Sequence, residues 1–329
     1  MNPDRRGAES PAIGVVALAG GVGGAKLARG LQDVLPGGAL SVIVNCGDDL
    51  VVHGLHVSPD LDTVMYTLAG IANPESGWGV RDDTWQAAGM LERYGTETWF
   101  RLGDCDLATH ILRTERLRSG ASLSEVTREL AEALGVPSRI LPMTDAPVRT
   151  RVRTDAGWLD FQDWFVRRRH ADDVREVRFD GIADAAPTQA VRDALTDADV
   201  IAVAPSNPFV SVGTILAVPG MLPALLAAAA PVVAVSPIVA GAALRGPADR
   251  MFVTLGGEPS ALGVARHYLE RHPGLLDGLV IDERDRALAP AIEALGLRVA
   301  VTDTIMTDAA SRAAVARALL ALGERIVGR

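Results

Sequence analysis

From Val200 to Leu244 the chain carries no charged side chain. A run of this length exceeds the roughly 20 apolar residues that a helix needs to span a membrane. Prolines at positions 205, 208, 219, 223, 231 and 237 cut it into pieces that are each too short to do so. Short pieces that are apolar on both faces are typical of covered strands in the middle of a parallel sheet. The stretch therefore predicts the buried interior of an α/β protein.

The start of the chain predicts the same kind of fold. An apolar run, Ala12–Ala19, is followed by a glycine cluster, a helix-like run to Leu35 and a second apolar run, Leu40–Cys46. Strand, glycine turn, helix and strand in this order make the first unit of a doubly wound sheet. Further strands are expected at Val200–Ala204, Pro231–Val235, Gly278–Ile281 and Arg298–Val301. We therefore expect an α/β fold with a doubly wound, Rossmann-like parallel sheet.

The apolar period changes between about Ser138 and Gly181. The segments VRTRVRT and WLDFQDWFV, joined by a short turn, alternate as an antiparallel hairpin does. We expect a small β-rich insertion over residues 138–187, a nucleotide-binding core over 12–137 and 188–329, and a disordered tail over 1–11. Helices are expected at Pro59–Gly70, Asp82–Tyr94, Asp104–Arg118 and Ser122–Leu134, with a last helix from Asp308.

Composition excludes several classes of protein. Lys and Arg number 32 against 41 Asp and Glu, so the net charge is −9 and argues against a nucleic-acid partner. Two cysteines cannot build a disulfide scaffold or a cysteine-rich zinc site. The amino terminus, MNPDRRGAESP, has no long apolar segment of the kind that a secretory signal contains. We expect a cytoplasmic protein without a membrane partner.

The glycine cluster between the first expected strand and helix is a candidate phosphate site. It contains Gly21, Val22, Gly23, Gly24 and Lys26. Glycines at this place let a phosphate approach backbone N–H groups at a helix N-terminus. The cluster is neither the dinucleotide fingerprint nor a Walker A loop, because Lys26 stands where the former needs a small residue and is followed by leucine. A tight turn without a ligand is the alternative.

Four carboxylates follow the second expected strand. Asp48 and Asp49 come at its end, and Asp60 and Asp62 lie in the first turn of the next helix. This is the carboxyl edge of the sheet, where open α/β folds bind ligands. Oxygen ligands next to a phosphate site suit Mg²⁺. The same residues could instead complement the helix dipole or bind a ribose, and chemistry alone does not choose between these interpretations.

Other polar and aromatic groups are expected at the same edge. Ser206, Asn207 and Pro208 leave the strand that begins the uncharged stretch, and Arg245 ends that stretch as a candidate phosphate cation. Trp78 and Trp85 could stack a flat heterocycle, although we favour core positions for them slightly. His53 is expected in a loop near the carboxylates, and His110 on a helix surface.

These segments together resemble one known family. The runs GGVGGAKLARGL, VNCGDDLVVHGLHVSPDLDTVMYTLAG, GWGVRDDTW, WFRLGDCDLATH, APSNPFVSVGTIL and SPIVAGAALRGPADRMF are similar to those of the CofD/FbiA family over about residues 15–307. The family comprises the 2-phospho-lactate or phosphoenolpyruvate transferases of coenzyme F-420 biosynthesis. The resemblance implies a guanosine diphosphate ester as donor, the deazaflavin alcohol Fo as acceptor, GMP as by-product, a requirement for Mg²⁺ and a homodimer.

The resemblance also implies roles for particular residues. Asp48 and Asp62 would hold Mg²⁺ against the diphosphate, and Asp60 or Asp49 would complete the metal shell or orient the attacking hydroxyl; Asp48, Asp49 and Asp62 are the expected catalytic residues. The expected nucleotide- and phosphate-binding residues are those of the glycine cluster together with Ser206, Asn207, Pro208, Ser211 and Arg245. The expected deazaflavin contacts are Asp49, His53, Trp78, Thr84 and Trp85.

Two other functions compete with the transferase. The YvcK-like proteins are a sister family that binds UDP-sugars and acts in regulation rather than as a transferase. Such a protein would have little need of the four carboxylates. An NAD-dependent oxidoreductase is the other alternative, and the interrupted fingerprint at Lys26 argues against it.

Overall fold

Seven parallel strands form the centre of the computed structural model, which describes residues 13–328. The predicted tail over residues 1–11 lies outside the described residues. The strand order is β14-β13-β10-β9-β1-β2-β5. In chain order the strands are β1 Val15–Ala19, β2 Leu40–Val44, β5 Arg139–Pro142, β9 Val200–Val203, β10 Val232–Val235, β13 Gly278–Asp282 and β14 Arg298–Thr302. The predicted doubly wound parallel sheet is confirmed.

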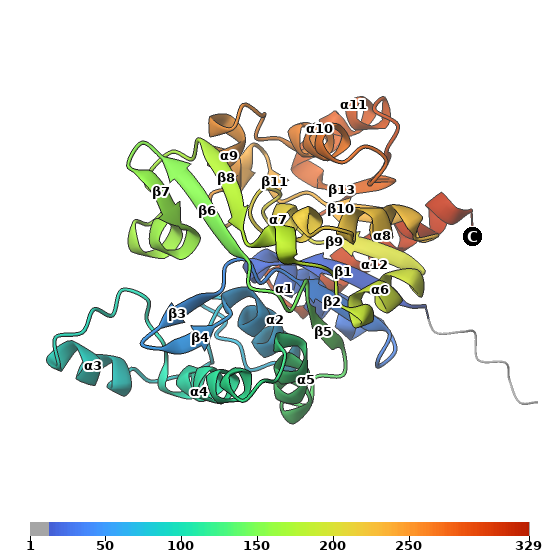
Figure 1. The fold of residues 1–329 in the computed structure, drawn as a ribbon. Helices are drawn as coiled ribbons and strands as arrows, with labels where there is room; N and C mark the ends of the chain where they lie inside the picture. The colour runs from blue at the N-terminus through green and yellow to red at the C-terminus, as the bar shows by residue number, and fades with distance from the viewer. Residues whose placement is uncertain (1–12, 329) are drawn as a thin grey trace, which may run out of the picture.

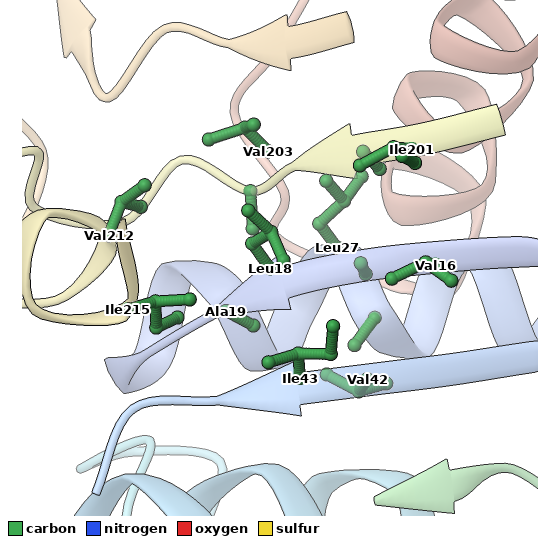
Figure 2. Packing of buried hydrophobic residues seen from close by; sticks show 14 of the residues in the cluster. Val16, Leu18, Ala19, Leu27, Val42, Ile43, Ile201, Val203, Val212 and Ile215 are labelled. Atoms are coloured by element: carbon green, nitrogen blue, oxygen red, sulfur yellow. The ribbon is translucent and has the colours of Figure 1, made fainter. Parts of the chain in front are cut away.

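The central strands are covered on both faces. Every residue of β1, β2, β9 and β10 is buried. Figure 2 shows side chains of β1, β2 and β9 meeting Leu27 of the first helix and Val212 and Ile215 of a later one. The uncharged stretch is therefore the inside of the sheet layer, as its two-sided apolar pattern predicts. None of the helices in the described part of the chain is long and apolar enough to cross a membrane.

Helices α1 Gly21–Val34, α2 Pro59–Ala69 and α12 Ala309–Val327 pack together, with α1 in contact with both of the others. Helices α7 Val212–Ala217 and α8 Met221–Ala227 connect β9 to β10. Strands β1, β2 and β5 progress one way across the sheet, whereas β9, β10, β13 and β14 progress the other way. Because parallel crossovers are right-handed, the helices that connect successive strands in the two halves cover opposite faces, whereas α12, which follows β14, packs on the same face as α1.

The reversal of strand order falls between β1 and β9. These two strands are neighbours in the sheet although far apart in the sequence. The loops that leave their carboxyl ends therefore diverge to opposite faces and leave a crevice between them, which is where open α/β sheets bind ligands. The crevice lies between the glycine cluster and the Ser206–Pro208 segment.

Two smaller sheets stand beside the carboxyl ends of the central strands (Figure 1). One contains β6 Arg149–Thr154, β7 Gly157–Asp160 and β8 Glu176–Asp180, in the order β7-β6-β8. It falls within the segment 138–187, while β5, at the start of that segment, is the edge strand of the central sheet. The other is a hairpin of β3 Leu50–Val52 and β4 Leu55–Val57, where the sequence predicted a loop. His53 and Gly54 form its turn with φ of 51° and 78°, which a two-residue hairpin of the primed type requires.

The remaining helices include α3 Gln86–Arg93, α4 Asp104–Arg118, α5 Leu123–Ala133, α6 Gln189–Thr196, α9 Ala248–Thr254, α10 Ala261–Arg271 and α11 Ala289–Glu293. Helix α4 has its predicted bounds, and α5 begins with a capping box between Ser122 and Glu125. Helix α3 begins four residues later than predicted. Asp82 has a φ of 56°, which a helix does not tolerate, and the following residues cap a neighbouring helix.

Candidate active site

A cavity of about 670 Å³ lies at the crevice between the loops after β1 and β9. Most of the candidate site residues from different parts of the chain line it together: Gly21, Val22, Gly23, Lys26, Asp48, Asp60, Asp62, Trp78, Ser206, Asn207, Ser211 and Arg245. The others do not line it: Gly24, Asp49, His53, Thr84, Trp85 and Pro208. The fold thus brings the glycine cluster, three of the four carboxylates and the Ser206–Ser211 segment to one place.

The glycines at the start of α1 are required by a close approach of the two loops. A Cβ on Gly23 would lie 2.6 Å from the Pro205 carbonyl oxygen, and one on Gly24 would lie 2.6 Å from Ser206 Oγ. The Ser206 hydroxyl donates to the Gly20 carbonyl over 2.8 Å and accepts from the Gly20 N–H over 3.1 Å. The turn and the second loop are therefore one rigid unit, with the N-terminus of α1 facing the cavity.

Asp48 and Asp60 form a buried pair of like charges. Both are less than a tenth exposed, and Asp48 Oδ1 has no hydrogen-bond partner. Burial, and then the charge of Asp60, raise the pKa of Asp48 well above its ordinary value. Burial raises the pKa of Asp60 to about 6, against hydrogen bonds from Asn45 and the Gly21 amide. Within residues 13–328 no cation is paired with either carboxylate, so a cation bound between them would favour their ionised forms.

Asp49 belongs to the hairpin rather than to the cavity. Its Oδ2 accepts a hydrogen bond from Ser58 Oγ at 2.7 Å and lies 2.9 Å from His56 Nε2. Burial raises the pKa of Asp49, and the hydrogen bond from His56 opposes this. Ser58 precedes α2, but its hydroxyl is bound to Asp49 and makes no cap for that helix.

The Asp62 carboxylate is paired with Arg113, a residue that was not predicted from the sequence as part of the site. The Arg113 guanidinium of α4 donates to both Asp62 oxygens, Nη1 over 3.0 Å and Nη2 more closely. His110 lies beside this pair, with Nδ1 3.7 Å from Asp62 and Nε2 3.2 Å from Asp106. The prediction that His110 lies on a helix surface is wrong, since it is 1% exposed. Asp62, Asp106 and His110 all line the cavity.

The spacing of charged residues in α4 could have indicated this part of the site from the sequence. Asp106, His110 and Arg113 recur at helical spacing on one face of α4, and that face is the buried one. The neighbouring Ile111 and Leu112 are exposed. A helix that turns its charged face inward is unusual, because buried charges are costly unless they are paired. The reversed pattern indicates a functional wall.

Two cations, Lys26 and Arg245, also line the cavity. Lys26 Nζ donates to the Met306 carbonyl over 2.8 Å, and burial, followed by the charges of Arg245 and Arg312, lowers the pKa of Lys26. The Arg245 guanidinium donates to the Ser76 carbonyl and, over 3.0 Å, to that of Glu75. Within residues 13–328, neither Lys26 nor Arg245 is paired with a carboxylate. Their positive charge is available to an anion in the cavity.

The Ser206–Ser211 segment is shaped by its own asparagine. Asn207 Oδ1 accepts from the Phe209 N–H over 2.9 Å, which closes a turn. Asn207 Nδ2 lies 3.3 Å from Met251 Sδ, a weak acceptor, so this amide keeps donor capacity toward the cavity.

Aromatic side chains also line the cavity. Phe161 and Phe165 stack at 5.4 Å with planes 9° apart, and Phe100 lines the same cavity. None of the three was predicted as a site residue, although Phe161 and Phe165 belong to the alternating WLDFQDWFV segment. Trp78 and Trp85 are 47% and 38% exposed, so the core positions that we favoured for them are wrong.

The expected deazaflavin contacts near Trp85 have structural roles elsewhere. Trp85 lies under the Arg101 guanidinium, 5.0 Å from the ring centroid. Thr84 Oγ1 donates to Asp104 over 2.5 Å, and His53 is exposed at the hairpin turn. None of these three lines the cavity.

The carboxylate oxygens at this site suit a hard divalent cation, such as Mg²⁺, whose remaining coordination positions are filled by a bound substrate. Among the described residues no three His, Cys, Asp or Glu side chains converge as a ready-made metal site. The Asp48 oxygen without a partner and the neighbouring Asp60 nevertheless offer carboxylate oxygen to an ion. Mg²⁺ commonly binds through one or two carboxylates together with substrate phosphates and water, which this arrangement suits.

Comparisons with known proteins agree over nearly the whole chain. The family model described as 2-phospho-L-lactate transferase CofD matches residues 15–317. The phosphoenolpyruvate transferase of Kitasatospora aureofaciens is 45% identical over 318 residues, covering 95% of this chain and 98% of that protein. That of Mycobacterium tuberculosis is 43% identical over 326 residues, covering 92% and 97%. A UPF0052 family member from Bacillus halodurans has a TM-score of 0.65 at 15% identity, covering 94% of this chain and 99% of that one.

The fold and site define an α/β transferase built around a switch-point cavity. The chain belongs to the CofD family, and with that family it is a transferase of coenzyme F-420 biosynthesis.

Proposed function

We propose that this transferase moves an enolpyruvyl phosphate group from its guanosine diphosphate ester to a primary hydroxyl of the deazaflavin Fo, with release of GMP. The observation that carries the proposal is the mixed lining of one cavity. A glycine turn, carboxylates and cations line it together with aromatic rings. An enolpyruvyl donor is favoured over a lactyl donor because the relatives at 43–45% identity are named phosphoenolpyruvate transferase.

The reaction exchanges one phosphorus–oxygen bond for another. The acceptor hydroxyl oxygen bonds to the phosphorus that carries the enolpyruvyl group, and the bond from that phosphorus to the oxygen of GMP breaks. The hydroxyl gives up its proton, and GMP leaves with the bridging oxygen. Such a transfer depends on alignment and on neutralising charge rather than on an enzyme nucleophile.

The polar lining of the cavity suits the donor. We assign the diphosphate to the backbone N–H groups at the start of α1 and to Lys26 and Arg245, whose charges have no carboxylate partner within residues 13–328. Arg245 would exchange its two carbonyl contacts for the stronger, charge-assisted bonds to phosphate. The guanosine is assigned to the Ser206–Ser211 segment, where Asn207 Nδ2 has only a sulfur acceptor.

Asp48, Asp60 and Asp62 would hold Mg²⁺. When bound, the ion would neutralise charge on the transferring phosphate, as metal ions do in phosphoryl transfer. Support comes from the lack of a paired cation at Asp48 and Asp60 within residues 13–328 and from the position of all three on the cavity wall.

The aromatic lining of the cavity suits the flat acceptor. We assign the deazaflavin ring to Phe100, Phe161 and Phe165 with Trp78, because aromatic faces stack a heterocycle in a water-poor site. Asp49, His53, Thr84 and Trp85, which the family resemblance implied, are left out of this assignment since they do not line the cavity.

The test is a reconstitution with the purified chain. With Mg²⁺, Fo and the enolpyruvyl guanosine diphosphate, mass spectrometry should find GMP and a phosphodiester of Fo in equal amounts. The lactyl donor, run in parallel, should react more slowly. Asp48→Asn should lower kcat by about a hundredfold or more if that carboxylate supports charge neutralisation. Absence of product with both donors, together with a higher melting temperature in a UDP-sugar, would favour the YvcK-like alternative instead.

A further inference from the structure

Helix α4 docks on α2 through charged side chains. Asp106, His110 and Arg113 are each less than a tenth exposed, and they face Asp62 and Tyr66 of α2. The apolar Ile111 of the same helix is 54% exposed. An ordinary helix of an α/β protein buries its apolar face. The reversed orientation of α4 therefore needs a reason other than hydrophobic burial.

Arg113 is the centre of this contact. It is 1% exposed, and its guanidinium donates to both oxygens of Asp62 in the bidentate arrangement that fixes a carboxylate plane. Its Nη1 also lies 3.4 Å from His110 Nδ1. His110 Nε2, at the other side of the ring, lies 3.2 Å from Asp106. Asp106 accepts in turn from the Tyr66 hydroxyl at 2.8 Å.

Stability alone is a weak explanation for this network. Removing an arginine and a carboxylate from water costs about as much free energy as their attraction returns, and apolar replacements of similar size are often as stable. A buried bidentate pair does, however, set the direction of its carboxylate. Asp62 lines the cavity, and each of its oxygens keeps a lone pair beyond the one that Arg113 occupies.

We propose that Arg113 is a positioning residue of the transferase, which aims the Asp62 carboxylate at the metal and phosphate part of the cavity. His110 lies against both members of this pair, with Nδ1 3.4 Å from Arg113 Nη1 and 3.7 Å from Asp62, and Asp106 lies 3.2 Å from His110 Nε2. The proposal rests on the proposed function, in which Asp62 holds Mg²⁺. Arg113 itself is absent from the cavity lining and acts through Asp62 alone.

Two variants of Arg113 separate direction from charge. Arg113→Lys keeps the positive charge but offers a single point donor in place of the planar fork. Arg113→Gln removes the charge. Arg116, one turn later on the same helix, is a matched control because it also makes a bidentate pair, with Glu129 at 2.9 and 2.7 Å, but partly exposed on the surface. Arg116→Gln should leave turnover and metal binding unchanged.

The first measurement is the affinity for Mn²⁺ in the absence of both substrates, monitored by electron paramagnetic resonance. Arg113→Lys should weaken Mn²⁺ binding by about tenfold, as loss of an outer partner of a metal ligand commonly does. The second measurement is steady-state turnover, in which kcat should fall by a similar factor while KM for Fo stays within about twofold. Both effects should occur with a melting temperature close to that of the unchanged chain.

The opposite result is well defined. If Arg113→Lys retains full Mn²⁺ affinity and kcat, the guanidinium does not aim Asp62 and the proposal is wrong. If Arg113→Gln fails to fold, Asp62→Asn/Arg113→Gln removes the unpaired buried charge and should restore the melting temperature without restoring kcat. Recovery of kcat in that double variant would show that Arg113 has only a structural role. If the unchanged chain has no turnover with these substrates, the proposed function fails, whereas the Mn²⁺ measurement still decides the role of Arg113.

Discussion

The ionisation of Asp60 opposes folding of the chain when no metal is bound. Burial raises its pKa to about 6, while an aspartate in an unfolded chain titrates near pH 4. Between about pH 4 and pH 6 the folded chain keeps a proton that the unfolded chain has lost, so stability falls as pH rises through this window. Above it the penalty is about 3 kcal/mol. A cation beside Asp48 and Asp60 would remove this penalty.

Asp60→Asn should therefore stabilise the metal-free chain at neutral pH. We expect its melting temperature at pH 7 to exceed that of the unchanged chain by roughly 5 °C, with little difference near pH 4. Circular dichroism melts at the two pH values measure this. Asp33→Asn, which affects a partly exposed carboxylate paired with Arg29, serves as the control. A variant that is less stable than the unchanged chain at pH 7 would show that Asp60 is already compensated.

Helices α3 and α4 cap each other, and this pairing positions the charged wall. Asp104, the first residue of α4, accepts from the Gln86 and Ala87 N–H groups of α3. Asp83, just before α3, accepts from the Cys105 and Asp106 N–H groups of α4 at 2.8 and 3.0 Å. The hydroxyl of Thr84, followed by these α3 amides, lowers the pKa of Asp104. The start of α4, which carries Asp106 and His110, is thereby fixed.

Asp83→Ala removes the cap of α4 and should cost about 1 kcal/mol of unfolding free energy. Because α4 carries Arg113, we also expect kcat to fall several-fold and hydrogen exchange to speed up in the first turn of α4. Ser122→Ala is the matched control, since Ser122 caps the next helix, α5, in the same way. It should lower stability by a similar amount and leave kcat unchanged. Equal effects of both variants on kcat would argue that α4 needs no special anchoring.

Several parts of the molecule form the cavity wall. The segments that follow β1 and β2 supply the glycine turn and the carboxylates, α4 supplies Asp106 and His110, and the segment after β7 supplies Phe161 and Phe165. In Figure 1 the β6–β7–β8 sheet stands above the carboxyl ends of the central strands, and α3 and α4 lie below them. The proposed donor and acceptor together would therefore contact surfaces from several segments of the chain, and no single segment provides them all.

Phe165→Leu tests the acceptor part of this cavity, because it removes the aromatic face at similar volume. We expect KM for Fo to rise by about tenfold, as loss of roughly 1 to 1.5 kcal/mol of aromatic contact implies, with KM for the donor unchanged. Trp158→Ala is the control, since Trp158 lies in the same small sheet under Arg178 and outside the cavity lining. An unchanged KM for Fo in Phe165→Leu would move the acceptor elsewhere.

The sequence by itself determined the central sheet and the edge at which the cavity forms. Apolar runs such as Ala12–Ala19 and Val200–Ala204 have the two-sided pattern of covered strands, and a glycine turn or an Asp48 that follows a parallel strand must lie at its carboxyl end. These inferences depend on the local spacing of apolar residues and on the handedness of parallel crossovers. They can therefore be made from residues that are close together in the sequence. The closeness of the glycine turn to Ser206 then follows from the reversal of strand order.

Only the tertiary structure decided where individual side chains of the site point. Asp48, Asp49, Asp60 and Asp62 read alike in the sequence, yet Asp49 is bound into a hairpin and Asp62 is bound by Arg113 from a distant helix. Phe165 enters the cavity, whereas Trp85 stays outside it. The direction of a side chain depends on the element that docks against it, and docking is a sum of many weak contacts between distant segments. The local sequence therefore does not predict the sum of these contacts or the side-chain directions that depend on it.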